Sequence, residues 1–350
     1  MISLFFAVNI GASGTAASMA PAYGSGAVPR RSTALALAGI AVAAGALFGG
    51  APVSRTIGGG LVPSRFFTAE TVIIVLAAAS TTLFAANLLG VPLSTSEVAV
   101  GSIVGLGLAE HALRLGHVLL IVGVWLAMPA AAFVIARGIT RWHPWLRRQL
   151  LPHPLWGRRL AAGLLTATGC AQAFAAGMNN VANAIGPLTG AHLTPLRSSL
   201  AWGAVFVGLG AFLLGGRVLD TNAKKLAQWS LLDGASAALI SGVLTVLASL
   251  EGLPVPLTQA STMAILGLQG PLLALPARPV ALRVLRIWVI SPIASLLVSY
   301  TAVDMLTNSR AHFPIALLAL LAAGWGLHAL RRRSRPQAKG EPRAPKGSDH

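Results

Sequence analysis

The chain of 350 residues is 55% hydrophobic and only 10% charged, with a mean hydropathy of +0.73. This composition excludes a soluble globular domain, a disordered chain and a disulfide-rich scaffold, and it is typical of a membrane protein. The formal net charge is +17. In a membrane protein, we expect such basic residues to set the orientation of the chain in the membrane and not to bind nucleic acid. One cysteine, Cys170, predicts neither an internal disulfide nor a metal site.

Apolar stretches that could each cross a bilayer follow one another along the chain, since a crossing helix needs about 20 apolar residues. The expected crossings are eleven, near residues 3–20, 33–50, 70–89, 92–109, 116–136, 161–187, 199–217, 231–251, 255–275, 284–303 and 313–330. Lys and Arg concentrate in the segments between them at 30–31, 137–159, 217–225, 278–286 and after 331. The positive-inside rule therefore predicts a multi-pass protein of the cell (inner) membrane, with its N-terminus outside and its C-terminus in the cytoplasm.

The chain matches itself at an offset of 162 to 166 residues. Gly11 falls on Gly177, Gly49-Gly50 on Gly215-Gly216, and Gly90-Val91-Pro92-Leu93 on Gly252-Leu253-Pro254-Val255. Five crossings in each half would turn the second half upside down, which is a transporter architecture. Chance matches in a chain with 38 Gly and 21 Pro are the alternative explanation. The expected segments are a first inverted repeat at 1–136, a basic linker at 137–159, a second repeat at 160–303, an extra helix at 304–330 and a disordered basic tail at 331–350, which contacts at most membrane lipid.

The first pair of repeat-related segments replaces apolar residues with small and amide ones, as Asn9–Thr15 and Gly177–Pro187. We expect both helices to be interrupted there. Asn179 and Asn183 share a helix face, with Asn180 beside them, and amides inside a membrane are costly unless they are paired or line a cavity. Hydrogen bonds that only hold helices together are the alternative.

The second pair, Pro92–Glu97 and Pro254–Gln259, places proline and hydroxyl residues before a new helix start. A helix that begins at membrane depth directs free N–H groups at whatever lies before it, and two such starts could enclose a tetrahedral oxyanion. Ordinary capping is the alternative for Ser94, which has capping-box spacing to Glu97. Together, the segments predict a substrate site made of Ser13, Ser94, Thr95, Ser96, Asn179, Asn180, Asn183, Thr258 and Gln259.

These segments resemble the inorganic phosphate transporter family, whose halves each carry a GANDVANA-like and a GLPVSTTH-like motif. GMNNVANAIGP at 177–187 and GVPLSTSE at 90–97 match well, whereas GASGTAASMAP at 11–21 and GLPVPLTQ at 252–259 match in part. The resemblance covers about residues 1–303 and is strongest to the sulfate permease branch. It implies an all-α membrane fold of two inverted halves with broken or re-entrant helices, oxyanion transport, no cofactor and a homodimer.

The departures from the family motifs bear on the substrate. The family's aspartate positions hold Gly14 and Asn180, and its histidine positions hold Glu97 and Gln259. A site that only donates hydrogen bonds prefers sulfate, because monohydrogen phosphate carries a proton that needs an acceptor. The motif aspartates are associated with sodium in the family, so their absence argues against sodium coupling.

Uptake of a dianion against an inside-negative potential costs about 5 kcal/mol per 100 mV, so cations must move with it. Glu97 is the carboxylate within the motifs. Burial beside an anion would favour its neutral form, which makes Glu97 a candidate proton carrier, with helix capping as the equal alternative.

Two other functions remain open from the sequence. A phosphate carrier of the same architecture is the first alternative. The second is an intramembrane serine protease, because Gly11-Ala12-Ser13-Gly14 matches a GxSG motif. Such an enzyme needs a histidine facing Ser13, and only His328, in the extra helix, is clearly placed within a crossing. We therefore expect a secondary transporter of sulfate or phosphate and not an enzyme.

Overall fold

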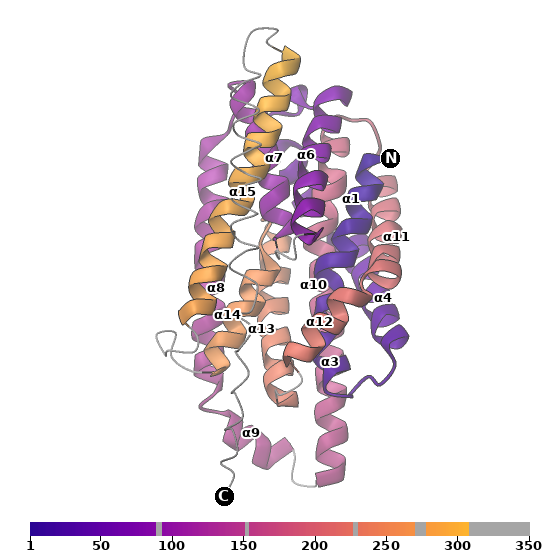
Figure 1. The fold of residues 1–350 in the computed structure, drawn as a ribbon, viewed down its shortest axis with the longest axis vertical. Helices are drawn as coiled ribbons and strands as arrows, with labels where there is room; N and C mark the ends of the chain where they lie inside the picture. The colour runs from indigo at the N-terminus through magenta and orange to yellow at the C-terminus, as the bar shows by residue number, and fades with distance from the viewer. Residues whose placement is uncertain (89–92, 151–153, 227–229, 270–277, 308–350) are drawn as a thin grey trace, which may run out of the picture.

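The computed structural model describes residues 1–88, 93–150, 154–226, 230–269 and 278–307, and within these ranges all regular structure is helical. Its helices run mostly along the long axis of the molecule (Figure 1). We call the end that carries α3, α9 and α12 in Figure 1 the lower end, and the opposite end the upper end. The expected extra helix at 304–330 lies mostly outside the described residues, and the tail at 331–350 lies wholly outside them.

The first half of the chain begins with a helix that changes its winding. After α1 (Ile2–Ile10), the segment η1 (Gly11–Thr15) is π-helical, where glycine and small residues weaken the regular hydrogen-bond ladder. The elements that follow are α2 (Ala16–Ser18), α3 (Ala20–Gly24), α4 (Arg31–Gly49), α5 (Ala51–Arg55), η2 (Thr56–Gly60), η3 (Ser64–Phe66), α6 (Ala69–Leu88), α7 (Thr95–Ala109) and α8 (Leu115–Ile139).

The second half begins after a short basic helix and contains the longest helix described. Its elements are α9 (His143–Leu150), α10 (Pro154–Gly190), α11 (Leu196–Leu214), α12 (Gly216–Leu226), α13 (Leu231–Leu250), α14 (Leu257–Gln269) and α15 (Arg278–Thr307). The interruption expected at 177–187 is wrong, because α10 continues through that segment to Gly190. Pro187 lies in the last turn of α10, where it leaves the carbonyl of Asn183 without its regular helical donor but does not end the helix.

Not every expected crossing is a full-length helix, and the eleventh, at 313–330, lies outside the described residues. Seven helices in the described part are long and apolar enough to cross a membrane, and they correspond to seven of the expected stretches. The stretches 3–20, 92–109 and 255–275 instead form shorter helices. α7 has 15 residues, so at about 1.5 Å per residue it does not span the ~30 Å core of a bilayer, and the described part of α14 has 13 residues.

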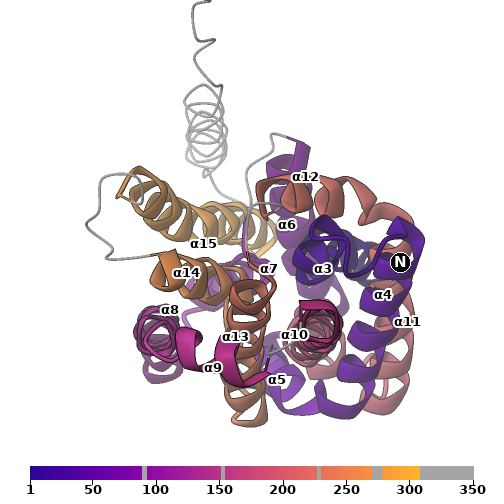
Figure 2. The ribbon, with the colours of Figure 1, turned by 90° about the horizontal axis from the view of Figure 1, so that it is seen from below.

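Helices from the two halves of the chain mix in two bundles. α1 and α4 pack against α10 and α11 on one side, while α7 and α8 pack against α15 and α14 on the other (Figure 2). α6 joins α1 to α7, and α13 joins α10 to α14. The expected segments 1–136 and 160–303 therefore do not form separate bodies.

The contacts between the halves occur twice with the partners exchanged. A Cβ built on Gly11 would lie 1.9 Å from the carbonyl oxygen of Val207, and one on Gly177 would lie 2.0 Å from that of Val42. Gly11 and Gly177 are related by an offset of 166 residues, and Val42 and Val207 by 165. Only glycine allows the helix backbones to approach so closely at these two crossings.

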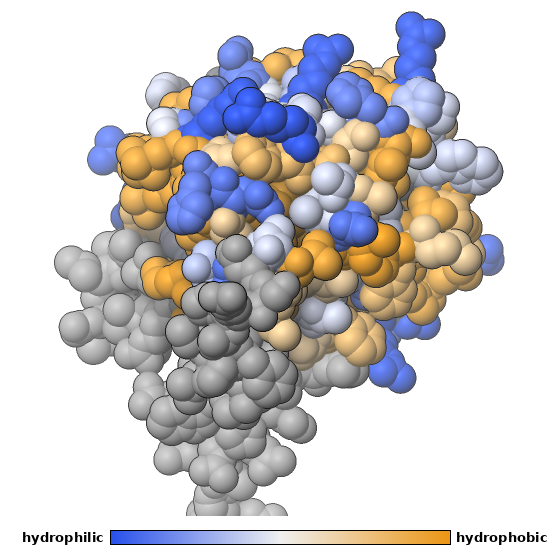
Figure 3. Space-filling model, turned by 90° about the horizontal axis from the view of Figure 1, so that it is seen from above, coloured by the Kyte–Doolittle hydropathy of each residue, from blue (hydrophilic) through white to orange (hydrophobic). Residues whose placement is uncertain are grey.

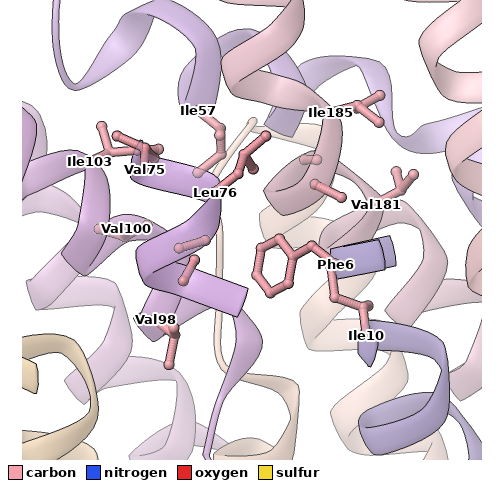
Figure 4. Packing of buried hydrophobic residues seen from close by; sticks show 14 of the residues in the cluster. Phe6, Ile10, Ile57, Val75, Leu76, Val98, Val100, Ile103, Val181 and Ile185 are labelled. Carbon is pink, nitrogen blue, oxygen red and sulfur yellow. The ribbon is translucent and has the colours of Figure 1, made fainter. Parts of the chain in front are cut away.

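The largest of three apolar clusters in the described part of the chain includes residues of α1, α6, α7 and α10. Phe6 of α1 is completely buried and points toward the helices that carry Leu76 and Val98 (Figure 4). Seen from above, hydrophilic side chains are interspersed with apolar ones over the upper end (Figure 3), and the long helices expose large apolar side chains such as Ile40, Leu126 and Leu213. An apolar flank is what a protein in lipid requires, since only its ends meet water.

Candidate functional site

The start of α7 lies deep in the protein. Ser94 is extended and caps the helix, because its Oγ accepts a hydrogen bond from the N–H of Glu97 at 3.4 Å. The first three residues of α7, Thr95, Ser96 and Glu97, are all buried. A helix start at this depth places its positive end inside the molecule.

Ser96 holds the start of α7 against the middle of α10. Its Oγ lies within donating distance of Asn179 Oδ1 at 3.1 Å and Asn180 Oδ1 at 3.4 Å, and it accepts from Asn183 Nδ2 at 3.2 Å. The three amides fall on one side of α10, and all four side chains are buried. We call Ser96, Asn179, Asn180 and Asn183 the central cluster.

Asn179 also binds the connection that precedes α14. Its Nδ2 donates to Ser249 Oγ at 2.9 Å and to the carbonyl of Leu253 at 3.1 Å, while its Oδ1 accepts from the N–H of Val255 at 3.1 Å. Trp125 Nε1 donates to the carbonyl of Pro254 at 2.7 Å and fixes the connection from its other side. The starts of α7 and α14 therefore both meet α10 near Asn179.

Glu97 and Gln259 are in direct contact. Gln259 Nε2 donates to Glu97 Oε1, and Ser291 Oγ of α15 donates to Glu97 Oε2. The carboxylate does not complete the capping box with Ser94, because its oxygens are engaged by α14 and α15. Glu97 is therefore a buried ionisable residue at the contact between α7 and α14, and both of its carboxylate oxygens accept hydrogen bonds.

Gly14 faces Asn180 across the site. A Cβ on Gly14 would lie 4.0 Å from Asn180 Nδ2, so the two family aspartate positions are adjacent and neither carries a charge. Four buried side-chain polar atoms of the described residues have no hydrogen-bond partner, and one of them, Asn183 Oδ1, belongs to the central cluster. Such groups are rare in folded proteins, and a bound ligand or water is a common reason for them.

The structure does not bring two of the predicted residues into the cluster. Ser13 donates to the carbonyl of Ile10 in its own helix at 3.3 Å, and Thr258 is exposed. Their predicted binding roles gain no support from this geometry. Ser94, Thr95 and Gln259 lie buried beside the cluster without hydrogen bonds to its amides.

Sequence reasoning missed three side chains that position the site, namely Ser249, Ser291 and Trp125. A signal existed for Ser249, because Ser241, Thr245 and Ser249 recur every four residues in an apolar helix. The same signal existed for Ser291, because Ser295 and Ser299 follow it at intervals of four residues in α15. Trp125 stands alone in an apolar segment, and nothing in the sequence marks it.

The fold and this site define a polytopic α-helical membrane protein with a polar centre held between two half-length helices. The chain belongs to the Phosphate transporter family, which it matches twice, at residues 10–159 and 154–299. It is therefore a transport protein and not an enzyme, which confirms that expectation over the protease alternative.

Two known proteins give the extent of the similarity. The sulfate permease CysP of Bacillus subtilis is 38% identical over 343 residues, covering 97% of this chain and 96% of the relative. A solved structure described as the sodium-dependent phosphate transporter superposes with a TM-score of 0.72 at 23% identity, covering 89% of this chain and 98% of the other. That likeness shows a common fold.

Proposed function

We propose that this protein imports sulfate through the central cluster, together with protons. The observation that carries the proposal is the position of Ser96, at the start of a half-length helix and bonded by three amides of α10. Hydroxyl groups, amide N–H groups and a helix start can all donate to an oxyanion. The relationship to a sulfate permease at 38% identity favours sulfate as that oxyanion.

The two family aspartate positions favour sulfate over phosphate. Gly14 and Asn180 carry no carboxylate, so these two positions neither repel a dianion nor offer a charged acceptor to a phosphate proton. Phosphate transport is the competing function, because a phosphate transporter has the same fold.

We infer that the halves 1–136 and 160–303 are inverted repeats. The exchanged contacts of Gly11 and Gly177 support this relationship, as does a second pair at α7 and α14: a Cβ on Gly105 would lie 2.5 Å from Leu296 O, and one on Gly267 would lie 2.5 Å from Phe133 O. In Figure 1, α7 lies in the upper half and α14 in the lower half. Alternating access would then arise from movement of one bundle against the other around the cluster.

We infer that the lower end faces the cytoplasm. The basic segments near α3, α9 and α12 all lie at that end (Figure 1), and the positive-inside rule assigns such an end to the cytoplasm. The N-terminus, at the start of α1, would then lie on the outer side.

The homodimer that the resemblance implies stays a prediction, which crosslinking in membranes would test.

Glu97 is the proposed proton carrier. Its carboxylate joins α7 to α14 and α15 through Gln259 and Ser291, so a change of its charge would alter contacts on both half-length helices. A neutral carboxyl can donate one of these hydrogen bonds and no longer accept both. Protonation would thereby be linked to the arrangement of the two bundles, which is what coupling requires.

The direct test is counterflow in proteoliposomes with labelled sulfate. We expect unlabelled sulfate to exchange and equimolar phosphate to leave the exchange nearly unchanged. Displacement of sulfate by equimolar phosphate would reverse the choice of substrate, and absence of exchange for both anions would contradict oxyanion transport.

A further inference from the structure

The second half of the chain carries hydroxyl groups where the first half carries apolar ones. Ser241, Thr245 and Ser249 recur every four residues, so they share one face of α13, and all three are fully buried. At an offset of 162 residues, Ser241 corresponds to Ala79, Thr245 to Leu83 and Ser249 to the polar Asn87 in α6. The packing of this helix face therefore does not require hydroxyl groups at the positions of Ser241 and Thr245.

Gln172 of α10 links this face to α14. Its Nε2 donates to Ser241 Oγ at 2.7 Å and to Ser261 Oγ at 2.8 Å. Gln172 lies two turns before Asn179, toward the lower end where α10 begins (Figure 1). At an offset of 166 residues, its counterpart in α1 is Phe6, which is buried in the apolar core. An amide thus lies below the central cluster and a phenyl ring lies above it.

The face of α14 beside Gln172 differs in the same way from its counterpart in α7. Thr258, Ser261 and Thr262 share that face, because they are spaced by three and four residues. Thr258 is exposed, and the other two are partly buried. The equivalent residues in α7, at an offset of 162, are 0%, 2% and 2% exposed: Ser96, Ala99 and Val100. The second-half face is open and polar, whereas the first-half face is closed and mostly apolar.

Hydroxyl groups in a membrane helix can be satisfied within that helix, which explains why they are tolerated here. Ser241 donates to the carbonyl of Ala237 and Thr245 to that of Ser241, both at 2.7 Å. This bonding does not explain why three hydroxyl groups in succession lead from Asn179 toward the lower end. Polar side chains at membrane depth usually mark a pathway or a site. All of these groups can donate hydrogen bonds and none carries a charge, which suits an anion in transit.

We propose that the anion passes between the central cluster and the lower end along these two faces, with Gln172 as the gate. We call the faces the hydroxyl path, defined as Ser241, Thr245, Ser249, Thr258, Ser261 and Thr262. The gate is closed in this structure, because the Gln172 amide ties α13 and α14 to α10. Opening exchanges its two hydrogen bonds for hydrogen bonds to the anion. The proposal rests on the proposed function, since it takes an oxyanion at the central cluster as its starting point.

Access of water to the path is tested by cysteine labelling in a Cys170→Ser background. Thr262→Cys and its counterpart Val100→Cys are treated with a membrane-impermeant thiol reagent, and Arg30→Cys and Arg65→Cys report the two ends. We expect Thr262→Cys to react from the lower end at least about tenfold faster than Val100→Cys, because reaction needs an accessible thiolate. Equal rates, or reaction of Thr262→Cys from the upper end alone, would overturn the path.

The gate is tested with Gln172→Leu and Gln172→Asn. We expect Gln172→Leu to lower the rate of sulfate exchange by about tenfold while sulfate binding by the purified protein changes less than about twofold, since a gate acts on transit and not on affinity. Gln172→Asn keeps the amide and should restore part of the rate. Unchanged exchange, or a parallel loss of binding and thermal stability in Gln172→Leu, would overturn the gate. Absence of sulfate binding by the wild-type protein would instead refute the proposed function, while the labelling pattern still decides the path.

Discussion

Glu97 and Gln259 are separated by 162 residues, occupy the same position in the two halves of the chain, and hydrogen-bond directly to each other. They join the starts of α7 and α14, whose described lengths are 15 and 13 residues. One of the pair can carry a charge and the other cannot. At this junction, the first half therefore supplies an ionisable group and the second half a neutral amide.

Substitution of Glu97 by Gln tests the coupling. Removal of the titratable group while a polar side chain is kept should make sulfate uptake insensitive to an imposed pH gradient, because no proton would then be carried. Uptake is measured in proteoliposomes with and without the gradient. Glu70→Gln, at an exposed residue in the first turn of α6, is the matched control and should retain gradient dependence. Unchanged gradient dependence in Glu97→Gln would remove this residue from the mechanism.

Substitution of Asn180 by Asp tests the substrate preference. A carboxylate beside Gly14 would repel a dianion, so we expect sulfate affinity to fall by at least about tenfold. Phosphate, which can donate its proton to the new carboxylate, should lose less. Equilibrium binding of the two labelled anions to purified protein measures both effects. Asn222→Asp, in α12, controls for the added charge, and equal affinity for sulfate in Asn180→Asp and wild type would argue against the donor-only site.

Substitution of Ser249 by Ala tests how Asn179 is held. The change removes the 2.9 Å hydrogen bond and leaves Asn179 Nδ2 with Leu253 O as its remaining acceptor. We expect a loss of about 1 kcal/mol in stability, and a weaker affinity for sulfate, because Asn179 also positions Ser96. Thermal unfolding in detergent and binding of labelled sulfate measure the two effects. Thr168→Val, at an exposed hydroxyl that bonds its own helix, is the control and should change neither stability nor affinity. If Ser249→Ala binds sulfate as tightly as wild type, Ser249 has a structural role only.

Substitution of Gly11 or Gly177 by Ala tests the close crossings between the halves. In each case the new methyl group would overlap a carbonyl oxygen of the facing helix, so we expect a loss of about 1–3 kcal/mol as the helices separate. The two variants should lower the unfolding temperature by similar amounts, because the contacts are equivalent. Gly123→Ala, where a Cβ meets nothing within 4 Å, should be neutral. Tolerance of either crossing variant would show that the backbones are not in contact there.

Much of the site could be predicted because its residues are unusual where they stand. Amides inside an apolar segment, and proline followed by hydroxyl residues, are local signals, and they led to Ser96, Asn179, Asn180 and Asn183. Ser13 and Thr258 carried the same kind of signal, yet the structure places neither in the cluster. The sequence cannot tell which way a side chain on a helix turns, because that depends on the helix packed against it.

By itself, the sequence determined that this is a helical membrane protein with two related halves and where its polar interruptions fall, since burial in lipid and helix capping act on neighbouring residues. The tertiary structure decided that α10 stays continuous, that α7 and α14 stop short of a full crossing, and that Glu97 meets Gln259. It also decided that Gln172 faces Ser241 and Ser261. These contacts join residues up to 194 positions apart, as at Glu97 and Ser291, and only the packing of helices from both halves brings them together.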